Sequence, residues 1–293
     1  MTKRSLIIGM GIGQLYKDVL TKLGHEVITI DSDPAKKADY TDICSAVTSQ
    51  WFDTAHICTP NYTHLEIAEN IAPYAKIVFI EKPGVKNNSE WTRLVRQRPF
   101  TRFMMVKNNM WRSNIDDLRA LADKAKTVNI EWTRRNCIPS PGSWFTTREL
   151  AYGGVSRDLM PHLLSLYVAM NPSWRTETVN GQSAQMLWQL KDIESTEYGT
   201  VNPNGTYDVD DKCTINFGNK WHCVANWRSM DYENSAIEFI MQDNTVERFD
   251  LGWCPEEAYH NMIADAIANM DDPKFWLDQF NIDSWIHERL ENL

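Results

Sequence analysis

Ser5-Leu6-Ile7-Ile8-Gly9-Met10-Gly11-Ile12-Gly13-Gln14 runs from a short apolar segment through three glycines into the helical pattern of residues 15–23. An apolar run, then glycines, then a helix predicts a strand, a tight turn and a helix N-terminus. The free N–H groups and the dipole of such a terminus favour negative charge, and glycines let a pyrophosphate approach the backbone. The stretch therefore predicts dinucleotide binding by Gly9, Gly11, Ile12 and Gly13. The alternative is a glycine-rich turn without a ligand, since the G-x-G-x-G spacing is one residue shorter than G-x-G-x-x-G.

The alternation of apolar runs and helical patterns continues outward from this stretch to about residue 110. The short runs, rich in Ile and Val, are 5–8, 26–30, 54–58, 76–80 and 102–106. Such alternation predicts a parallel sheet with helices on both faces. Beyond residue 110 strands follow one another with short turns, as at 217–221, which favours an antiparallel sheet in an α+β second half. We therefore expect an α/β chain with two domains, 1–115 and 116–293.

Asp31 stands at the end of the second predicted strand, 18 residues after Gly13. A carboxylate at this position accepts hydrogen bonds from the ribose hydroxyls of NAD and repels the 2′-phosphate of NADP. The sequence therefore predicts NAD rather than NADP as the cofactor. Two alternatives stay open: Asp33 can serve in place of Asp31, and Asp31 can be an ordinary turn residue or helix cap.

Two further turns follow strands of the same predicted sheet. The third strand leads into Thr59-Pro60-Asn61-Tyr62-Thr63-His64, and the fourth into Glu81-Lys82-Pro83-Gly84. Ligands of open parallel sheets bind beyond the carboxyl ends of the strands, so both turns should face the same crevice as the glycines. There the Lys82 ammonium can hydrogen-bond a substrate hydroxyl and exchange a proton with it. The alternative is a Lys82 that only pairs with Glu81 at the surface.

The second half contains Gly153-Gly154-Val155-Ser156-Arg157-Asp158-Leu159-Met160-Pro161-His162. Ser156 is suited to cap a helix that we expect over residues 157–170. Asp158 and His162 are four residues apart and should therefore share one face of that helix. An imidazole exchanges protons near neutral pH, and a neighbouring carboxylate can orient it or bind a further hydroxyl. The alternative is an Asp–His pair that only stabilises the helix.

These motifs together resemble the glucose–fructose oxidoreductase and inositol dehydrogenase family (Gfo/Idh/MocA). The resemblance covers about residues 5–170, and its most specific parts are the E-K-P turn and the later G-G…D-x-x-x-H segment. It implies a Rossmann domain followed by a domain with an open, mainly antiparallel sheet that often forms oligomer contacts. It also implies NAD(P)-linked oxidation or reduction of a sugar, cyclitol or related hydroxy compound.

The resemblance further implies roles for individual residues. Lys82 would be the catalytic lysine, His162 its acid/base partner, and Asp158 a substrate-orienting or proton-relay group. The residues that would line the cofactor crevice are Thr59, Pro60, Asn61, His64 and Glu81. Tyr16 departs from the family pattern, which often has His at this position.

Trp144 and Arg148 lie just before Gly153, where the resemblance places substrate contacts. A Trp ring can stack on a sugar face, and an Arg can hold a carboxylate or phosphate through two hydrogen bonds. We therefore expect both residues to bind substrate. The alternative is a core Trp and an exposed Arg.

The composition argues against several classes of function. With 30 Lys and Arg against 39 Asp and Glu, the net charge of −9 repels nucleic acid. No apolar stretch approaches the roughly 20 residues of a membrane-spanning helix. The six cysteines form no C-x-x-C pair, and we expect a cytoplasmic protein with reduced thiols. His222 and Cys223 are neighbours on a predicted strand and should point to opposite faces, so we expect no metal site.

We therefore expect an NAD-dependent oxidoreductase that moves a hydride between nicotinamide and a carbinol carbon of a sugar, nucleotide sugar or cyclitol. Lys82 and His162 would handle the hydroxyl proton. The expected partners are a carbohydrate-like substrate and further copies of the chain, as a dimer or tetramer formed through the C-terminal sheet. Two alternatives stay open: a reductase of an imine or unsaturated small molecule, and an NAD-binding regulatory protein without turnover.

Overall fold

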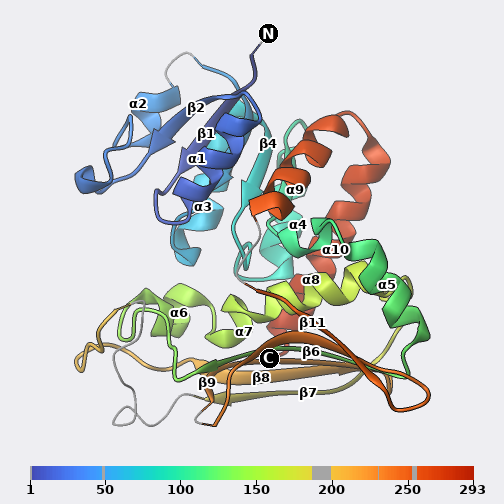
Figure 1. The fold of residues 1–293 in the computed structure, drawn as a ribbon. Helices are drawn as coiled ribbons and strands as arrows, with labels where there is room; N and C mark the ends of the chain where they lie inside the picture. Colours follow the sequence, from blue (N-terminus) through green and yellow to red (C-terminus); the bar gives the residue numbers. More distant parts are fainter. Residues whose placement is uncertain (1, 48–49, 187–198, 230, 253–255) are drawn as a thin grey trace. The chain divides into compact units, whose positions relative to one another are not determined.

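The computed structural model describes residues 2–47, 50–186, 199–229, 231–252 and 256–293 (Figure 1). The chain forms two compact units. Unit 1 contains residues 1–106 and 256–288, and unit 2 contains residues 107–255 and 289–293.

Unit 1 is built on a five-stranded parallel sheet. Its strands are β1 (Arg4–Ile8), β2 (Glu26–Ile30), β3 (Phe52–Ile57), β4 (Ala75–Ile80) and β5 (Arg102–Met105), in the spatial order β2-β1-β3-β4-β5. The apolar runs form strands because both faces of the sheet are covered, and Leu6 and Ile7 on successive sides of β1 are both fully buried. The strand order reverses between β1 and β3, which is the switch point where ligands of such sheets bind.

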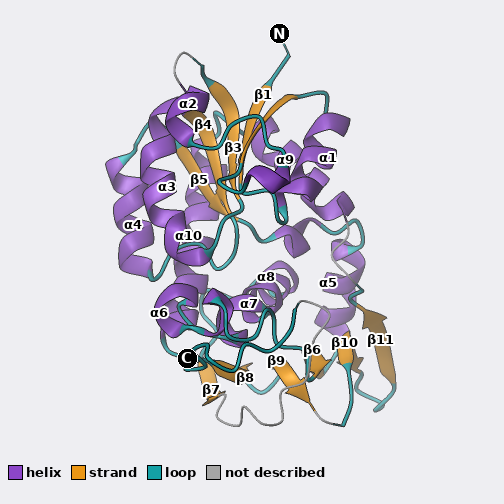
Figure 2. Cartoon of the chain, turned by 90° about the vertical axis from the view of Figure 1, so that its left-hand side faces the viewer, coloured by secondary structure: helices purple, strands orange, loops and turns teal. Residues whose placement is uncertain are grey.

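Helices cover both faces of this sheet. Figure 2 shows α1 (Gly13–Lys22) and α9 (Glu256–Ala268) on one side, with α3 (His64–Ile71) and α4 (Asn88–Gln97) on the other. A short α2 (Ile43–Val47) follows β2, and the first part of α10 (Pro273–Glu291) also belongs to this unit. The parallel sheet covered on both faces confirms the fold class expected for the first half of the chain.

The C-terminal helices return to unit 1, although the expected boundary at residue 115 assigned them to the second domain. Lys22 on α1 forms an ion pair with Glu256 at the start of α9. The buried carboxylate of Asp283 on α10 accepts a hydrogen bond of 3.1 Å from the backbone N–H of Met105. Amphipathic spacing predicts that such helices exist but not which core they cover, and here they cover the parallel sheet.

Unit 2 is built on a six-stranded sheet. Its strands are β6 (Thr127–Arg135), β7 (Val179–Met186), β8 (Asp210–Phe217), β9 (Trp221–Ser229), β10 (Asn234–Ile240) and β11 (Val246–Asp250), in the order β11-β10-β6-β9-β8-β7. Only the β6–β9 pairing among these neighbours is parallel, which confirms a mainly antiparallel sheet. Figure 1 shows α5 (Ile115–Lys124), α7 (Val155–Asp158) and α8 (Met160–Met170) against one face, and α6 (Arg148–Ala151) lies nearby in the chain.

The turn at 217–221 is the expected hairpin, but two other elements differ from expectation. Phe217 pairs with Trp221 across the turn, where Gly218 has φ +51°. The helix expected over 157–170 is divided into α7 and α8, with Pro161 in the first turn of α8, where its missing N–H does not interrupt the helix.

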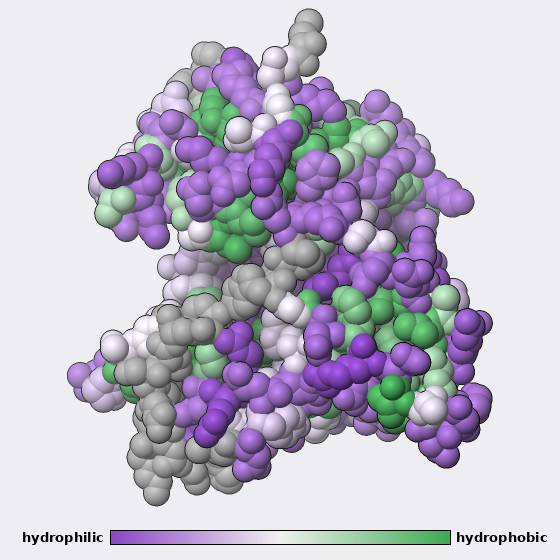
Figure 3. Space-filling model, viewed as in Figure 1, coloured by the Kyte–Doolittle hydropathy of each residue, from purple (hydrophilic) through white to green (hydrophobic). Residues whose placement is uncertain are grey.

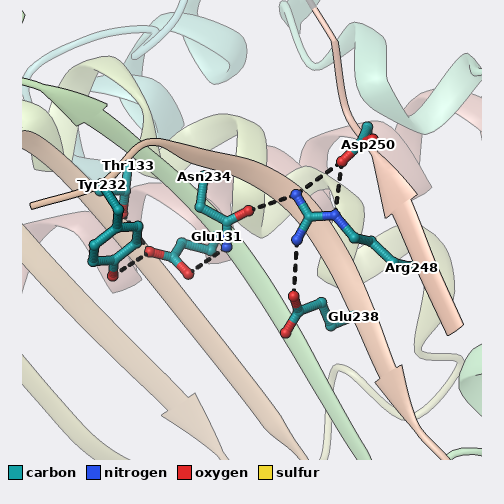
Figure 4. A network of polar contacts seen from close by, with 7 residues as sticks. All are labelled: Glu131, Thr133, Tyr232, Asn234, Glu238, Arg248 and Asp250. Carbon is teal, nitrogen blue, oxygen red and sulfur yellow. Dashed lines mark hydrogen bonds and ion pairs between the residues drawn. The ribbon is translucent and has the colours of Figure 1, made fainter. Parts of the chain in front are cut away.

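A network of polar side chains joins β6, β10 and β11 (Figure 4). Arg248 binds Glu238 directly across the strand pair and also reaches Asp250 and Asn234. Glu131 on β6 accepts hydrogen bonds from Tyr232 and from Asn234. Exposed pairs of this kind contribute about 1 kcal/mol or less each, so the network mainly holds the strand register.

The surface of each unit is rich in hydrophilic residues on the face that Figure 3 shows. The apolar side chains gather instead in the cores, where residues such as Phe79 in unit 1 and Phe217 in unit 2 are fully buried. Of the helices in the described residues, none combines the length and apolar character needed to cross a membrane.

Candidate functional site

The glycine-rich turn at the end of β1 fits closely against the end of β3. Gly9 has φ +93°, and a Cβ added to it would lie 2.6 Å from the carbonyl oxygen of Cys58. A Cβ at Gly13 would lie 2.9 Å from Cγ2 of Ile7. Glycine is therefore required at both positions, at Gly9 by backbone conformation as well as by space. These contacts place the start of α1 at the switch point of the sheet.

The N-terminus of α1 is open and has no acidic side chain in its first turn. Gly11 and Ile12 are exposed, and a Cβ added to Gly11 would have no atom within 4 Å. A helix N-terminus that borders open space and has no carboxylate in its first turn matches the needs of a pyrophosphate. The residues present thus fit the dinucleotide, despite the shortened glycine spacing.

Asp31 lies beside this turn. Its Oδ2 accepts a hydrogen bond of 2.7 Å from the N–H of Met10, and its Oδ1 accepts one of 2.9 Å from the N–H of Asp33. The Asp33 carboxylate instead caps the short helix at Pro34–Lys36 through the N–H of Ala35. The geometry favours Asp31 over Asp33 as the ribose ligand. Asp31 is a turn residue as well, and its oxygens keep further lone pairs for hydroxyl donors.

The turn after β4 holds a buried carboxylate next to Lys82. Glu81 is 7% exposed, and its Oε1 accepts a hydrogen bond of 2.5 Å from the Tyr16 hydroxyl. Burial, and then the charge of Glu81, raise the pKa of Tyr16 well above its ordinary value. Its hydroxyl therefore stays protonated and keeps donating to Glu81. Lys82 itself is half-buried, and its backbone N–H lies 3.2 Å from Glu81 Oε2.

His64 ties the turns after β3 and β4 together. Its Nε2 is 2.8 Å from the carbonyl oxygen of Thr59, and its Nδ1 is 2.7 Å from that of Gly84. Burial is the largest influence and lowers the pKa of His64, while the two carbonyl contacts oppose this. The ring is fully buried between its two carbonyls, so it links the turn after β3 to the turn after β4. Pro60 and the buried Asn61 lie in the same turn as Thr59.

His287 on α10 also supports the Lys82 turn, and sequence reasoning did not select it. Its Nε2 accepts a hydrogen bond of 3.2 Å from the N–H of Val85, and its Nδ1 donates to the carbonyl oxygen of Asp283 at 2.7 Å. A Cβ on Gly84 would lie 2.6 Å from His287 Nε2. No local signal connects these residues, because His287 is 202 positions after Val85.

The Gly153-Gly154 segment of unit 2 is held by Asp210 on β8. The Asp210 carboxylate accepts hydrogen bonds from the N–H of Gly154 at 2.8 Å, from the N–H of Ser156 at 2.7 Å and from Ser156 Oγ at 2.8 Å. The N-cap of α7 is Gly154, so the expectation that Ser156 caps this helix is wrong. Instead, the Asp210 carboxylate on strand β8 accepts hydrogen bonds from the N–H groups at the start of α7.

Asp158 and His162 lie on successive helices, each with contacts to its surroundings. The indole N–H of Trp227 donates to Asp158 Oδ2 at 2.9 Å. His162 is 8% exposed, its Nδ1 is 3.3 Å from Asn109 Nδ2, and its ring centroid is 5.5 Å from that of Trp132. Both side chains are therefore anchored by residues outside their own helices.

Trp144 and Arg148 lie in and after the loop that precedes Gly153. Trp144 stacks on Phe145 with ring centroids 3.9 Å apart, and it is neither fully exposed nor part of the core. The Arg148 guanidinium donates from Nε to the carbonyl oxygen of Asp208 at 3.1 Å, and the Arg148 N–H donates to the Asp208 carboxylate at 2.7 Å. Arg148 thus joins two parts of unit 2, and substrate contact by either residue stays a prediction.

His222 is half-buried and bonds to Asn216, whereas the adjacent Cys223 is fully buried. The two side chains therefore point to opposite faces of the sheet, as the strand period requires. Within the ranges that the structure describes, no group of three or more His, Cys, Asp or Glu residues is arranged to hold a metal ion.

A family model described as "Oxidoreductase family, NAD-binding Rossmann fold" (GFO_IDH_MocA) matches residues 4–98. A putative UDP-kanosamine synthase oxidoreductase subunit from Amycolatopsis mediterranei is 30% identical over 196 residues. That match covers 61% of this chain and 55% of the relative, so it spans little more than half of the relative's length.

Three solved structures are similar to nearly the whole chain. GenD2 from gentamicin A biosynthesis, in complex with NAD, has a TM-score of 0.76 at 18% identity, covering 99% of this chain and 92% of its own. A myo-inositol dehydrogenase from Corynebacterium glutamicum has a TM-score of 0.72 at 13% identity, covering 99% and 95%. Levoglucosan dehydrogenase with NADH and levoglucosan has a TM-score of 0.70 at 14% identity, covering 99% and 97%. At these identities the likenesses show a shared fold.

Proposed function

We propose that the chain, whose residues 4–98 match the model of the Gfo/Idh/MocA oxidoreductase family, is an NAD-dependent dehydrogenase or reductase of a carbohydrate-like substrate. The substrate would be a sugar, nucleotide sugar or cyclitol with a carbinol carbon. The observation that carries this proposal is the open N-terminus of α1, set against Cys58 by Gly9 and flanked by Asp31. Pyrophosphate and ribose are the groups that such a pairing recognises.

The residues that would hold NAD are the α1 N-terminus at Gly11 to Gly13 for the pyrophosphate, Asp31 for the ribose, and the Thr59 and Glu81 turns as the crevice wall. The bound cofactor would supply a hydride acceptor or donor. Lys82 would bind the substrate hydroxyl and exchange its proton, since a lysine amine can both donate and accept a proton and Lys82 is half-buried in the turn after β4. Asp158 would orient the substrate or relay its proton, and His162 would contact the reacting hydroxyl.

The substrate class is supported by the relatives, whose names refer to UDP-kanosamine, inositol and levoglucosan. Trp144 would provide an aromatic platform for a sugar ring, and Arg148 a positive group for a charged substituent. We also propose that the chain forms homo-oligomers through the unit 2 sheet.

The experiment that tests the function is a substrate screen with the purified protein. NAD and NADP, and their reduced forms, are offered with sugars, cyclitols and nucleotide sugars while the absorbance of reduced nicotinamide is followed. We expect turnover with at least one carbohydrate and NAD or NADH. Imines and unsaturated carbonyl compounds form a second panel. Turnover confined to that panel would favour the reductase alternative, and tight NAD binding without any turnover would favour a regulatory protein.

Asp31→Ala is expected to weaken NAD binding by about tenfold to a hundredfold, because hydrogen bonds to a charged group contribute about 1.5–3 kcal/mol. NADP binding should weaken less or improve, because the repulsion of its 2′-phosphate is removed. The measurement is the dissociation constant of each cofactor, followed by fluorescence.

Asp31→Ala also removes the hydrogen bond to the Met10 N–H and could loosen the turn. A loosened turn should weaken the binding of NAD and NADP equally, whereas loss of a ribose contact should change the ratio of their dissociation constants. Asp33→Ala is the matched control and should change either constant by less than about threefold. Tighter binding of NADP than of NAD by the unmutated protein would contradict the role of Asp31.

A further inference from the structure

Arg112 fixes the orientation of the Asn109 side chain. Its Nε donates to Asn109 Oδ1 at 2.8 Å, while its Nη2 donates to the carbonyl oxygen of Leu251 at 2.9 Å. Arg112 and Asn109 are 7% and 2% exposed. A guanidinium has only donors, so the atom of the Asn109 amide that faces it must be the oxygen. The amide nitrogen is then directed to the opposite side.

That amide nitrogen faces His162. Asn109 Nδ2 lies 3.3 Å from Nδ1 of His162. An amide NH₂ can only donate, so Nδ1 of the imidazole must accept with its lone pair. In a neutral imidazole the remaining proton is then on Nε2. Trp132 packs against the ring, with centroids 5.5 Å apart, and opposes a rotation that would exchange the ring nitrogens for carbons.

We propose that Asn109 and Arg112 are positioning residues that hold His162 as its Nε2–H tautomer, so that His162 donates a hydrogen bond to the substrate oxygen and does not accept its proton. This inference rests on the proposed function and refines it. A nitrogen that already carries a proton has no lone pair to act as a base. As an alkoxide-like charge develops on the substrate oxygen, a fixed donor stabilises it.

The proton is then assigned to Lys82. In the oxidation, a bound nicotinamide would accept the hydrogen of the carbinol C–H bond with its electron pair, as hydride. The O–H proton would pass to the lone pair of the Lys82 amine, and the freed oxygen pair would form the carbonyl bond. His162 Nε2 keeps its hydrogen throughout. The reduction reverses these steps, with the Lys82 ammonium as proton donor.

The tautomer is measured directly by NMR, without substrate. Protein with ¹⁵N-labelled histidine is studied by long-range ¹H–¹⁵N correlation at about two pH units above the ordinary imidazole pKa of about 6.5. The signal of His162 is assigned by its loss in His162→Gln. We expect the pattern of the Nε2–H tautomer. The Nδ1–H pattern for His162 in the unmutated protein would overturn the proposal.

Asn109→Asp inverts the arrangement, because a carboxylate still accepts from Arg112 but now also accepts from Nδ1–H. We expect His162 to change to the Nδ1–H tautomer, and an unchanged tautomer would contradict the role of Asn109. Asn180→Asp is the matched control on exposed β7, with the same change of charge, and should leave the signal unchanged. If Asn109→Asp does not fold, the spectrum of the unmutated protein alone decides the tautomer.

Kinetics provide the second readout once a substrate is found. Asn109→Asp should lower kcat by about a hundredfold, as loss of one fixed donor to a developing oxyanion typically does. The dissociation constant of NAD should stay the same. A kcat within about threefold of the unmutated value would contradict the donor role. The tautomer is observed whether or not turnover is found, so failure of the proposed function is distinguished from failure of this inference.

Discussion

Lys82→Ala is expected to lower kcat/KM for the substrate by about 10³-fold or more, within the range of general acid–base groups. Lys82 would be the group that takes up the hydroxyl proton, and the alanine variant keeps neither a base nor a hydrogen-bond donor at this position. The turn itself should survive. Glu81 is held by Tyr16 and by the Lys82 backbone N–H, neither of which the substitution removes. Initial rates under saturating NAD measure the effect.

Two further variants test whether Lys82 acts by transferring a proton or only by its positive charge. Lys82→Arg keeps the positive charge, but a guanidinium does not lose its proton near neutral pH, so we expect it to be nearly as inactive as Lys82→Ala. Lys86→Ala removes an exposed lysine four residues along the same segment and should retain nearly full activity. NAD binding by Lys82→Ala should change by less than about threefold. Turnover of Lys82→Ala within about tenfold of the unmutated protein would exclude Lys82 as the proton acceptor.

Elements defined by local pattern were predictable from the sequence. The apolar run at 54–58 is β3 (Phe52–Ile57), and the turn at Gly218 joins β8 and β9 as expected. These elements depend on the period of burial and on backbone freedom, which neighbouring residues reveal. The glycine-rich turn is similar, because a strand, a glycine and a helix appear in it consecutively.

Residues that act from a distance in the chain were not predictable. His287 supports the Lys82 turn from 202 residues away, and Asp210 caps α7 from 54 residues beyond Ser156. Amphipathic spacing placed the C-terminal helices on some core but did not specify which one. The sequence around Asn109 and Arg112 gives no sign that they orient the imidazole of His162, because their contact with it depends on where α8 packs. The contacts that support these turns and helices therefore need tertiary structure, whereas the candidate site residues themselves were selected from local motifs.

Gly154→Ala is expected to cause a large loss of stability in unit 2. A Cβ at this position would lie 1.8 Å from the carbonyl oxygen of Asp210, so the α7 segment and β8 must move apart. Separation breaks the Asp210 hydrogen bonds to Gly154 and Ser156. Bonds to a charged group contribute about 1.5–3 kcal/mol each and overpacking costs a further 1–3 kcal/mol, so we expect a loss of about 4 kcal/mol or more. Urea unfolding measures it.

Gly181→Ala is the matched control, on β7 of the same sheet. Its Cβ would have no neighbour closer than Asn216 Nδ2 at 3.7 Å, which is an ordinary contact. We expect a change of less than about 1 kcal/mol. Equal stability of the two variants would contradict the tight approach of Gly154 to Asp210.

Since Asp158 and His162 follow on α7 and α8, any folded fraction of Gly154→Ala should also lose turnover, while its NAD affinity, which depends on unit 1, should persist. Loss of turnover with unchanged NAD affinity would indicate that Gly153 and Gly154 support the reaction of the substrate, whereas the turn at Gly9 binds the cofactor.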